Sequence, residues 1–324
     1  ASVAGVLLIL GVGIMLWMKP EENGVWEGEK TVEPGIGQVV LTLGDGESMP
    51  LKRDTNRLIF GGTMLQVRNE RGTLVYSRIK SKEASEKIVY NTLTVPVRER
   101  FQLVLADGTK VFLNSGSEMR YPERFGKARR EVFLKGEAWF EVAKDSAREF
   151  WVHAGAMDVK VLGTSFNVKA YERLETVATT LVEGSVEVAC AGKSFQIVPG
   201  EQFVYDKNNR VMDVRMVDTE SYVSWKDGYY KFRQTTLEEI METLSVWYGL
   251  NVFYVNESAK QVEFTGKVKR YEDARMLLDK FEQTGDVVFD IKGNNVFITI
   301  KQKKPFAREW NSFLVKARGM VWQS

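Results

Sequence analysis

The stretch VFLKGEAWFEVAKDSAREFWVHAGAMDVKVLGTSFNV, residues Val132 to Val168, decides the fold of this chain. Its apolar residues alternate with polar ones in short runs, and the runs end at turn-forming pairs such as Lys135-Gly136, Lys144-Asp145 and Gly163-Thr164. Short runs with period two, separated by frequent turns, are typical of strands in a β-sandwich, barrel or solenoid. The stretch therefore predicts a stacked all-β body.

The same pattern extends to both sides as a repeated strand–turn–strand unit. Residues 38–51 and 102–113 each hold an alternating run, an Asp-Gly pair (Asp45-Gly46 and Asp107-Gly108) and a second apolar run. Asp-Gly favours a tight hairpin because glycine adopts a positive φ without a Cβ clash. Further strands are predicted over 176–182, 185–189, 194–198, 202–205 and 211–214. We therefore expect residues 38–217 to form one stacked all-β domain of solenoid or sandwich type.

Residues 218–301 show a different pattern, which predicts an α+β module. Asp218-Thr219 can cap a short helix, and Thr236-Leu-Glu-Glu239 is a capping box that begins a longer one. Apolar residues then recur at helical spacing until Gly249, and a second helix at 272–283 repeats their pattern. Strands are predicted at 229–232, 251–255, 262–268, 287–291 and 295–300. The order of these elements indicates two βαβ units in tandem.

Composition and charge exclude several functional classes. The chain has 324 residues, of which 44% are hydrophobic and 27% charged, an ordinary globular balance. Its 45 basic and 43 acidic residues give a net charge of +2, so nothing favours nucleic-acid binding, which needs a concentrated basic face. The chain has 1 cysteine (Cys190) and 1 histidine (His153), which leaves no basis for a disulfide framework or for most metal sites. We expect no metal and no cofactor.

The chain opens on an apolar run with no charged residue between positions 1 and 18. At about 1.5 Å per residue the run spans nearly the roughly 30 Å of a bilayer core, and Trp17 and Lys19 close it as interfacial anchors do. A signal peptide and a buried core helix are the alternatives. We expect residues 1–19 to be a transmembrane helix and residues 20–37, rich in Gly, Pro and Glu, to be a linker.

Several motifs occur along the chain in an order that resembles one family. They are Leu105–Asn114, Leu134–Val142, Val161–Val168, Leu181–Val186 and Pro199–Gln202 in the β part, and Leu237–Ile240, Trp247-Tyr248 and Phe264–Gly266 in the α+β part. The order resembles the FecR family of anti-sigma factors, transmembrane regulators of cell-surface signalling in Gram-negative bacteria. The last part resembles the C-terminal module of the Bacteroidetes branch, which is similar to the short signalling domains of secretins and TonB-dependent receptors.

The resemblance implies a relay. A TonB-dependent outer-membrane transporter presents a periplasmic signalling domain, the regulator receives it in the periplasm, and an extracytoplasmic-function sigma factor is inhibited or released. It also implies an inner-membrane, single-pass protein with a mostly periplasmic chain. The family has a cytoplasmic sigma-binding segment before its membrane span, and we expect one upstream of Ala1. We assign contact with the transporter to aromatic residues of the module: Tyr229, Tyr230, Phe232, Trp247, Tyr248 and Phe264. Exposed sheet edges at 229–232 and 295–300 could receive a partner strand.

The pair Gly163-Thr164 fits two roles. It suits a turn or bulge glycine followed by an ordinary strand threonine. The resemblance implies a second role, because part of the family cleaves itself at this Gly-Thr bond by a shift of the glycyl carbonyl to the threonine oxygen. Glycine gives unhindered access and threonine supplies the hydroxyl, but no base is evident in the sequence.

Other candidate residues fit structural roles better. His153 lies in an apolar run and suits a hydrogen-bonded core or rim position, and Cys190 suits a small buried apolar residue. Glu137 and Glu141 fit an exposed strand face. The basic tail 302–324 carries Trp310, Phe313 and Leu314 but has no assigned structure. A membrane-anchored scaffold without signalling is the main functional alternative, and a periplasmic hydrolase is weaker because no nucleophile–base pair is visible.

Overall fold

The structure is a computed structural model that describes residues 37–51, 57–60, 65–70, 73–78, 88–270, 273–284 and 286–301. The predicted membrane helix at 1–19, nearly all of the linker and the tail at 302–324 lie outside these ranges. Within them, no helix has the length and apolar character needed to cross a bilayer.

The β body, Val39–Met216, is built from two long sheets, and the first of them, sheet A, has the strand order β2-β1-β6-β9-β10-β11-β12-β15-β16. Its strands are β2 (Ser48–Leu51), β1 (Val39–Thr42), β6 (Tyr90–Val95), β9 (Ser117–Pro122), β10 (Arg130–Glu141), β11 (Phe150–Ala154), β12 (Met157–Val161), β15 (Val186–Cys190) and β16 (Lys193–Ile197). All neighbours are antiparallel except β10 and β11, which are parallel.

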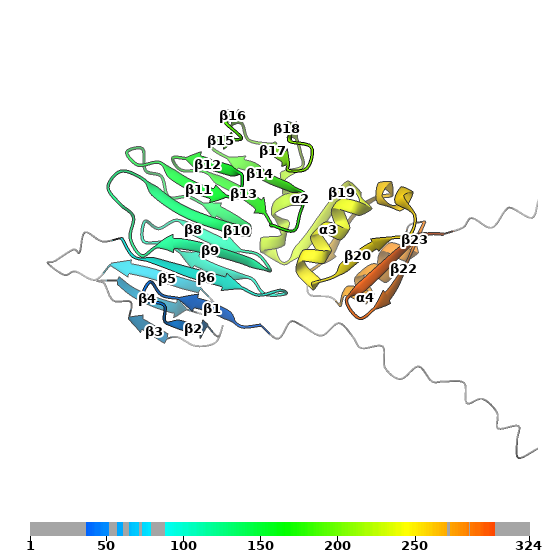
Figure 1. Ribbon diagram of the computed structural model, residues 1–324, viewed down its shortest axis with the longest axis horizontal. Helices are drawn as coiled ribbons and strands as arrows, with labels where there is room; N and C mark the ends of the chain where they lie inside the picture. The colour runs from blue at the N-terminus through cyan, green and yellow to red at the C-terminus, as the bar shows by residue number, and fades with distance from the viewer. Residues whose placement is uncertain are drawn as a thin grey trace, which may run out of the picture.

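Sheet B has the order β3-β4-β5-β7-β8-β10-β13-β14-β17-β18. Its further strands are β3 (Arg57–Phe60), β4 (Leu65–Glu70), β5 (Thr73–Arg78), β7 (Phe101–Val104), β8 (Lys110–Leu113), β13 (Ser165–Ala170), β14 (Thr176–Glu183), β17 (Glu201–Asp206) and β18 (Val211–Met216). In Figure 1 the strands stack from β2 and β3 at the bottom to β16 and β18 at the top. This stack confirms the predicted all-β architecture.

The 12-residue strand β10 belongs to both sheets because it bends at Gly136. Gly136 has a φ of +102°, and a Cβ there would lie 2.4 Å from Ser117 Oγ. The sequence predicted a turn at Lys135-Gly136 that separates two strands. That prediction was wrong, because the glycine bends one continuous strand from sheet A into sheet B.

The core of the β body lies between the sheets, and it includes the alternating apolar residues of the opening stretch together with apolar residues of the other strands. Phe140 and Phe166 stack at 5.2 Å between ring centroids, and Phe140 reaches Phe150 of sheet A at 6.2 Å. The Asp-Gly pairs form hairpin turns as predicted, with Gly46 at a φ of +92° and Gly108 at +87°. The period-two pattern therefore identified core residues and these two turns.

The C-terminal module follows the β body. A short helix α2 (Thr219–Val223) and a 3-10 helix η1 (Ser224–Asp227) lead into it. Its elements are β19 (Tyr229–Thr236), α3 (Leu237–Tyr248), β20 (Asn251–Tyr254), a 3-10 helix η2 (Glu257–Gln261), β21 (Glu263–Lys269), α4 (Ala274–Thr284), β22 (Val287–Lys292) and β23 (Asn295–Ile300). Thr236 caps α3 by accepting from the Glu239 N–H, and Gly249 ends it at a φ of 68°, as the sequence predicted.

The module contains two β-α-β units, β19-α3-β20 and β21-α4-β22, and the strands of each unit belong to two different sheets. β19 pairs with β21, while β20 and β22 flank β23 in a three-stranded sheet. Each unit therefore places its first strand in one sheet and its second strand in the other. The helices and both sheets enclose one apolar core, which gives the module its own stable interior.

Candidate functional site at the junction of the β body and the C-terminal module

A row of directly opposed residues crosses the outward face of sheet B. The row consists of Trp139, Asn167, Thr180, Gln202 and Arg215. Gln202 Nε2 donates to Thr180 Oγ1 at 2.9 Å, and Arg215 Nη2 donates to Gln202 Oε1 at 3.1 Å. Trp139 packs in the apolar core of the C-terminal module. The module therefore lies on this face of the β body.

One arginine of the module lies buried at the junction. Arg270 directly follows β21 and is 0% exposed. Its Nη1 donates to the Trp225 backbone oxygen at 2.7 Å, and its Nη2 donates to Asn114 Oδ1 at 2.9 Å. The guanidinium carbon lies 3.3 Å from the centroid of the Trp247 ring. Because Asn114 belongs to the β body, this side chain joins the two parts by a charge-assisted hydrogen bond.

A buried carboxylate completes the contact from the other side. Glu137 on β10 accepts from Asn114 Nδ2 at 2.6 Å and from Asn167 Nδ2 at 2.9 Å. Asn167 Oδ1 in turn accepts from Trp225 Nε1 at 3.2 Å. Burial raises the pKa of the Glu137 carboxyl, against the opposing influence of Lys169 and the two amides.

These contacts close into a cycle, which we name the junction ring: Asn114, Glu137, Asn167, Trp225 and Arg270. Each member hydrogen-bonds the next, from Arg270 through Asn114, Glu137 and Asn167 to Trp225 and back. Asn114, Glu137 and Asn167 come from the β body, and the other members come from η1 and the module. If the module moves, it therefore either breaks these buried hydrogen bonds or displaces the β-body side chains that make them. Breaking them is costly, because the buried donors and acceptors are then left without partners.

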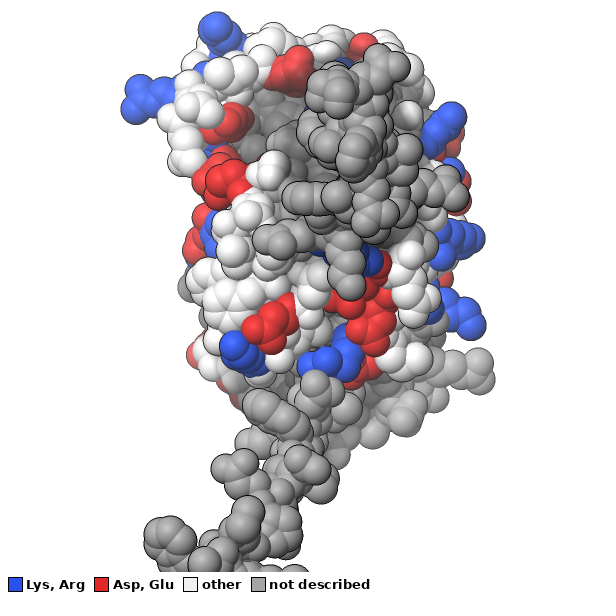
Figure 2. Space-filling model, turned by 90° about the vertical axis from the view of Figure 1, so that its right-hand side faces the viewer, with Lys and Arg blue, Asp and Glu red and all other residues white. Residues whose placement is uncertain are grey.

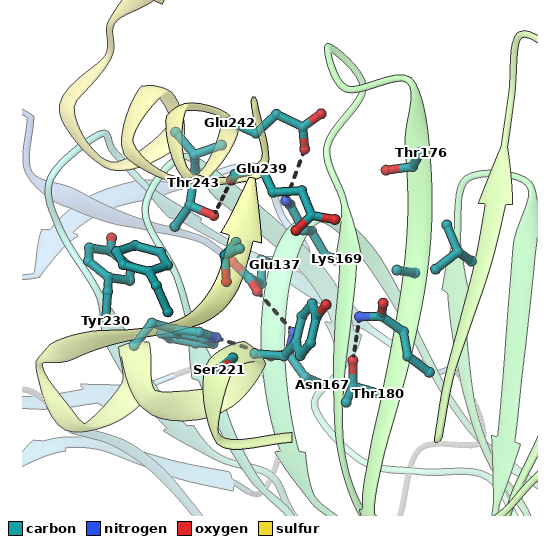
Figure 3. Close-up of a pocket in the computed structure, with 18 of the residues that line it drawn as sticks. Glu137, Asn167, Lys169, Thr176, Thr180, Ser221, Tyr230, Glu239, Glu242 and Thr243 are labelled. Atoms are coloured by element: carbon teal, nitrogen blue, oxygen red, sulfur yellow. Dashed lines mark hydrogen bonds and ion pairs between the residues drawn. The ribbon is translucent and has the colours of Figure 1, made fainter. Parts of the chain in front are cut away.

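A cleft of about 300 Å³, lined by charged, polar and apolar side chains, lies beside the junction ring, between sheet B and helix α3. Lys169 and Glu242 form an ion pair across it at 3.4 Å, and Arg215 and Glu239 form another at 3.7 Å. Figure 3 shows Glu242 on α3 reaching Lys169 on sheet B, with Glu239 beside them. The cleft contains both acidic and basic side chains. Among the described residues no three or more His, Cys, Asp or Glu side chains lie together in a way that could hold a metal ion.

The aromatic residues assigned to partner contact form the interior of the module instead. Five of these side chains are buried in its core: Tyr230, Phe232, Trp247, Tyr248 and Phe264. Tyr229 is half-buried, and its hydroxyl donates to Glu220 Oε1 at 3.1 Å. The prediction that the buried residues face a partner was wrong, because two thin sheets need large side chains to fill the space between them and the helices.

The prediction of two exposed sheet edges was wrong for one of the two strands. β23 lies between β20 and β22, so the strand at 295–300 is central and has no free edge. Within the described residues β19 pairs only with β21. In Figure 2 basic and acidic residues are interspersed over the part of the module's face that the grey residues leave visible.

The bond between Gly163 and Thr164 is held on both sides. Thr164 is 5% exposed, its Oγ1 donates to the Ser185 backbone oxygen at 3.0 Å, and its backbone oxygen accepts from Val142 N–H at 3.0 Å. A Cβ on Gly163 would lie 2.8 Å from Lys144 Cα, so the backbones approach closely and glycine is needed there. The hydroxyl faces a carbonyl acceptor, which cannot take up its proton.

His153 and Cys190 have structural surroundings. His153 Nδ1 lies 2.7 Å from Asp158 Oδ1, and its ring stacks on Phe133 at 4.9 Å. Cys190 is buried and free. Both therefore contribute to packing, as the sequence indicated.

The sequence missed most of the junction ring. Asn114, Glu137 and Asn167 lie inside the family motifs, but Glu137 was assigned to an exposed strand face. The alternation correctly places Glu137 outside the β-body core, and the module then buries that outward face. Arg270 follows the basic residues Lys267 and Lys269, which suggest only a solvated strand end.

Comparisons with known proteins match both sides of the junction. Residues 91–187 match the family model described as FecR protein, and residues 229–298 match the model described as FecR, C-terminal. Two crystal structures of a candidate anti-sigma factor from Parabacteroides distasonis are similar to the chain at 27% identity and a TM-score of 0.60. The matches cover 65% and 66% of this chain and 99% and 100% of the matched chains. No curated protein matches the chain.

Proposed function

Because this chain belongs to the FecR family of anti-sigma factors, we propose that it relays a signal from a TonB-dependent outer-membrane transporter to an extracytoplasmic-function sigma factor. In this proposal residues 1–19 cross the inner membrane and the remainder lies in the periplasm. The C-terminal module receives the periplasmic signalling domain of the transporter. The β body carries the effect toward the membrane.

The junction ring is the observation that carries this proposal. A relay needs a receiver whose displacement reaches the next part, and Arg270 of the module is fully buried against Asn114 of the β body. Further contacts support the connection, since Ser115 Oγ donates to the Val246 backbone oxygen at 3.1 Å and Arg98 Nη2 to that of Tyr248 at 3.2 Å. A passive scaffold needs the module to be attached but does not need a buried polar network that is sensitive to its orientation.

Direct binding tests the receiver role. The full chain, solubilised in mild detergent and immobilised, is incubated at micromolar concentration with the purified signalling domain of the TonB-dependent transporter encoded beside it. We expect this domain to be retained and the signalling domain of an unrelated transporter to be washed away. Absence of retention would remove the transporter from the proposal and favour the scaffold alternative.

Self-cleavage at Gly163-Thr164 is a second candidate activity. Thr164 Oγ1 would attack the Gly163 carbonyl carbon, a C–O bond would form as the C–N bond breaks, and the proton would pass to the released amine of Thr164. Water would then hydrolyse the ester to a Gly163 carboxylate and a Thr164 hydroxyl. A surface depression of about 460 Å³ beside the bond gives water access to it.

Strand pairing favours a cut that leaves the fragments together. β10 and β12 precede the bond and pair with β13 and β15, which follow it. Intact-mass spectrometry of the purified chain under denaturing conditions is expected to give two fragments that co-elute before denaturation, whereas the variant Thr164→Ala stays in one piece. A single full-length mass for the wild type contradicts this second activity without affecting the relay.

A further inference from the structure

The last strand of sheet B exposes an unusual number of apolar side chains for a strand at a sheet edge. Within the described residues β18 pairs only with β17, and it lies at the top end of the stack in Figure 1. Val211 is 57% exposed, Val214 36% and Met216 71%. Exposed apolar edge strands can pair with another chain, and natural proteins usually protect them. On β18 the charged residues Asp213 and Arg215 alternate with apolar side chains, and within the described residues no further strand covers the edge.

The hydrogen-bond ladder decides which groups the free edge presents. Val217 N–H donates to the Gly200 oxygen at 2.9 Å, and these residues continue the β17–β18 register. Along an antiparallel strand, every second residue directs its backbone N–H and C=O groups toward the same neighbouring strand. Counting back from Val217, these groups of Val211, Asp213 and Arg215 therefore point toward β17. The N–H and C=O groups of Met212, Val214 and Met216 therefore point away from β17, in the plane of the sheet, and are available at its free edge.

The charges on β18 are self-complementary in only one antiparallel register of two such edges. If Val214 lies opposite Val214 of a second copy, the outward backbone groups of Met212 meet those of Met216, and Asp213 lies opposite Arg215 twice. A shift by two residues in one direction places Asp213 opposite Asp213, and in the other direction Arg215 opposite Arg215. Opposite charges across a strand pair stabilise it and like charges destabilise it, each by about 0.2–1 kcal/mol.

We propose that β18 is an interaction surface for β18 of a second copy of this chain, paired antiparallel about Val214. Sheet B then continues from one copy into the other. The local two-fold axis is perpendicular to the sheet, so both C-terminal modules lie on the same face of the joined sheet. Asp213 of the second copy adds to the row of residues that runs through Arg215 and Gln202 to the junction ring.

Single cysteines on β18 test the pairing in the full chain. In the proposed register the two copies of residue 214 lie about 5.5 Å apart at Cα, within the range of a disulfide, whereas the two copies of residue 211 are about 20 Å apart. Under mild oxidation Val214→Cys is expected to form a disulfide-linked dimer, and Val211→Cys, on the same strand and exposed, is expected to form none. Cys190 is buried, so the wild type gives the background.

Charge reversals on the Val214→Cys background test the register. Asp213→Arg alone and Arg215→Asp alone are each expected to lose the cross-link, because like charges then face one another. A mixture of these two variants is expected to regain it, since every Asp then faces an Arg, and this recovery shows that both variants are folded. The proposal would be overturned if Val214→Cys gave no cross-link, if residue 211 cross-linked equally well, or if the charge reversals had no effect. These outcomes also cover the case in which a strand of a different protein occupies this edge.

Discussion

The two asparagines of the junction ring orient the charges around them. Asn114 presents its oxygen to Arg270 and its nitrogen to Glu137, and Asn167 presents its oxygen to Trp225 and its nitrogen to Glu137. Both oxygens of Glu137 are therefore acceptors, as an ionised carboxylate requires. The ring holds a buried anion and a buried cation in one arrangement, and each depends on the other members to remain hydrogen-bonded.

Replacement of Arg270 tests the energetic weight of the ring. Arg270→Ala removes the donors to Trp225 and Asn114 and the cation over Trp247, so we expect a loss of about 2–4 kcal/mol in the free energy of unfolding. Urea denaturation followed by tryptophan fluorescence measures this loss. Lys269→Ala, one residue earlier and exposed, is the matched control and should change the free energy by less than about 0.5 kcal/mol. Equal effects of the two variants would contradict a special role for Arg270.

The raised pKa of Glu137 predicts a pH dependence with a defined sign. The folded state binds the Glu137 proton more tightly than the unfolded state, whose pKa lies near 4.5. The wild type should therefore lose stability relative to Glu137→Gln as the pH rises from about 4.5 through the folded-state pKa, and the difference should then level off. Urea denaturation of both proteins at a series of pH values measures it. A difference that does not change with pH, or that grows in favour of the wild type, would show that burial does not control this carboxyl.

At the scale of elements, β10 is the strand on which the architecture depends. It joins both sheets of the β body, carries Glu137 and Trp139 on the face that meets the module, and changes direction at Gly136. A Cβ at Gly136 would meet both the side chain and the backbone of Ser117, so the bend brings β10 against β9 more closely than any other residue type permits.

Substitution of Gly136 separates the cost of a positive φ from the cost of close approach. Gly136→Ala meets Ser117, whereas Gly46→Ala has a comparable φ of +92° with no atom within 4 Å. We expect Gly46→Ala to cost about 1–2 kcal/mol from backbone strain and Gly136→Ala to cost clearly more, because the clash adds to the strain. Thermal unfolding of both variants provides the comparison. If they lose equal stability, the contact with Ser117 is relaxed at no cost.

The sequence predicted those elements that depend on local chemistry. Asp107-Gly108 and the Thr236 capping box determine a turn and a helix start within a few residues, and both are present as expected. The junction ring could not be predicted in this way, because its members lie up to 156 positions apart and meet only after the module has packed on sheet B. The burial of Tyr230 and Phe232 was missed for the same reason, since an aromatic residue in a short strand suits a core and a surface equally.

At the scale of the whole molecule, the two family-matched regions meet through the junction ring and through the buried hydrogen bond from Ser115 to Val246. The stack of strands has one apolar core, and the module lies on the outward face of sheet B around a second core, which Trp139 of the β body joins. The cleft with its ion pairs separates the parts on one side of the ring, so a change of module orientation can open the cleft while it strains the ring. This arrangement suits an anti-sigma regulator whose state depends on a partner of the module.

Transcription from a sigma-dependent promoter in cells tests the relay most directly. The cells carry either the wild-type chain or Arg270→Ala, matched in abundance by immunoblot, and the transporter's substrate is added. We predict that substrate changes reporter output with the wild-type chain, and that Arg270→Ala still binds the signalling domain but no longer transmits the change. An unaltered response with Arg270→Ala would contradict transmission through the junction ring, and a response that persists without the chain would contradict the relay itself.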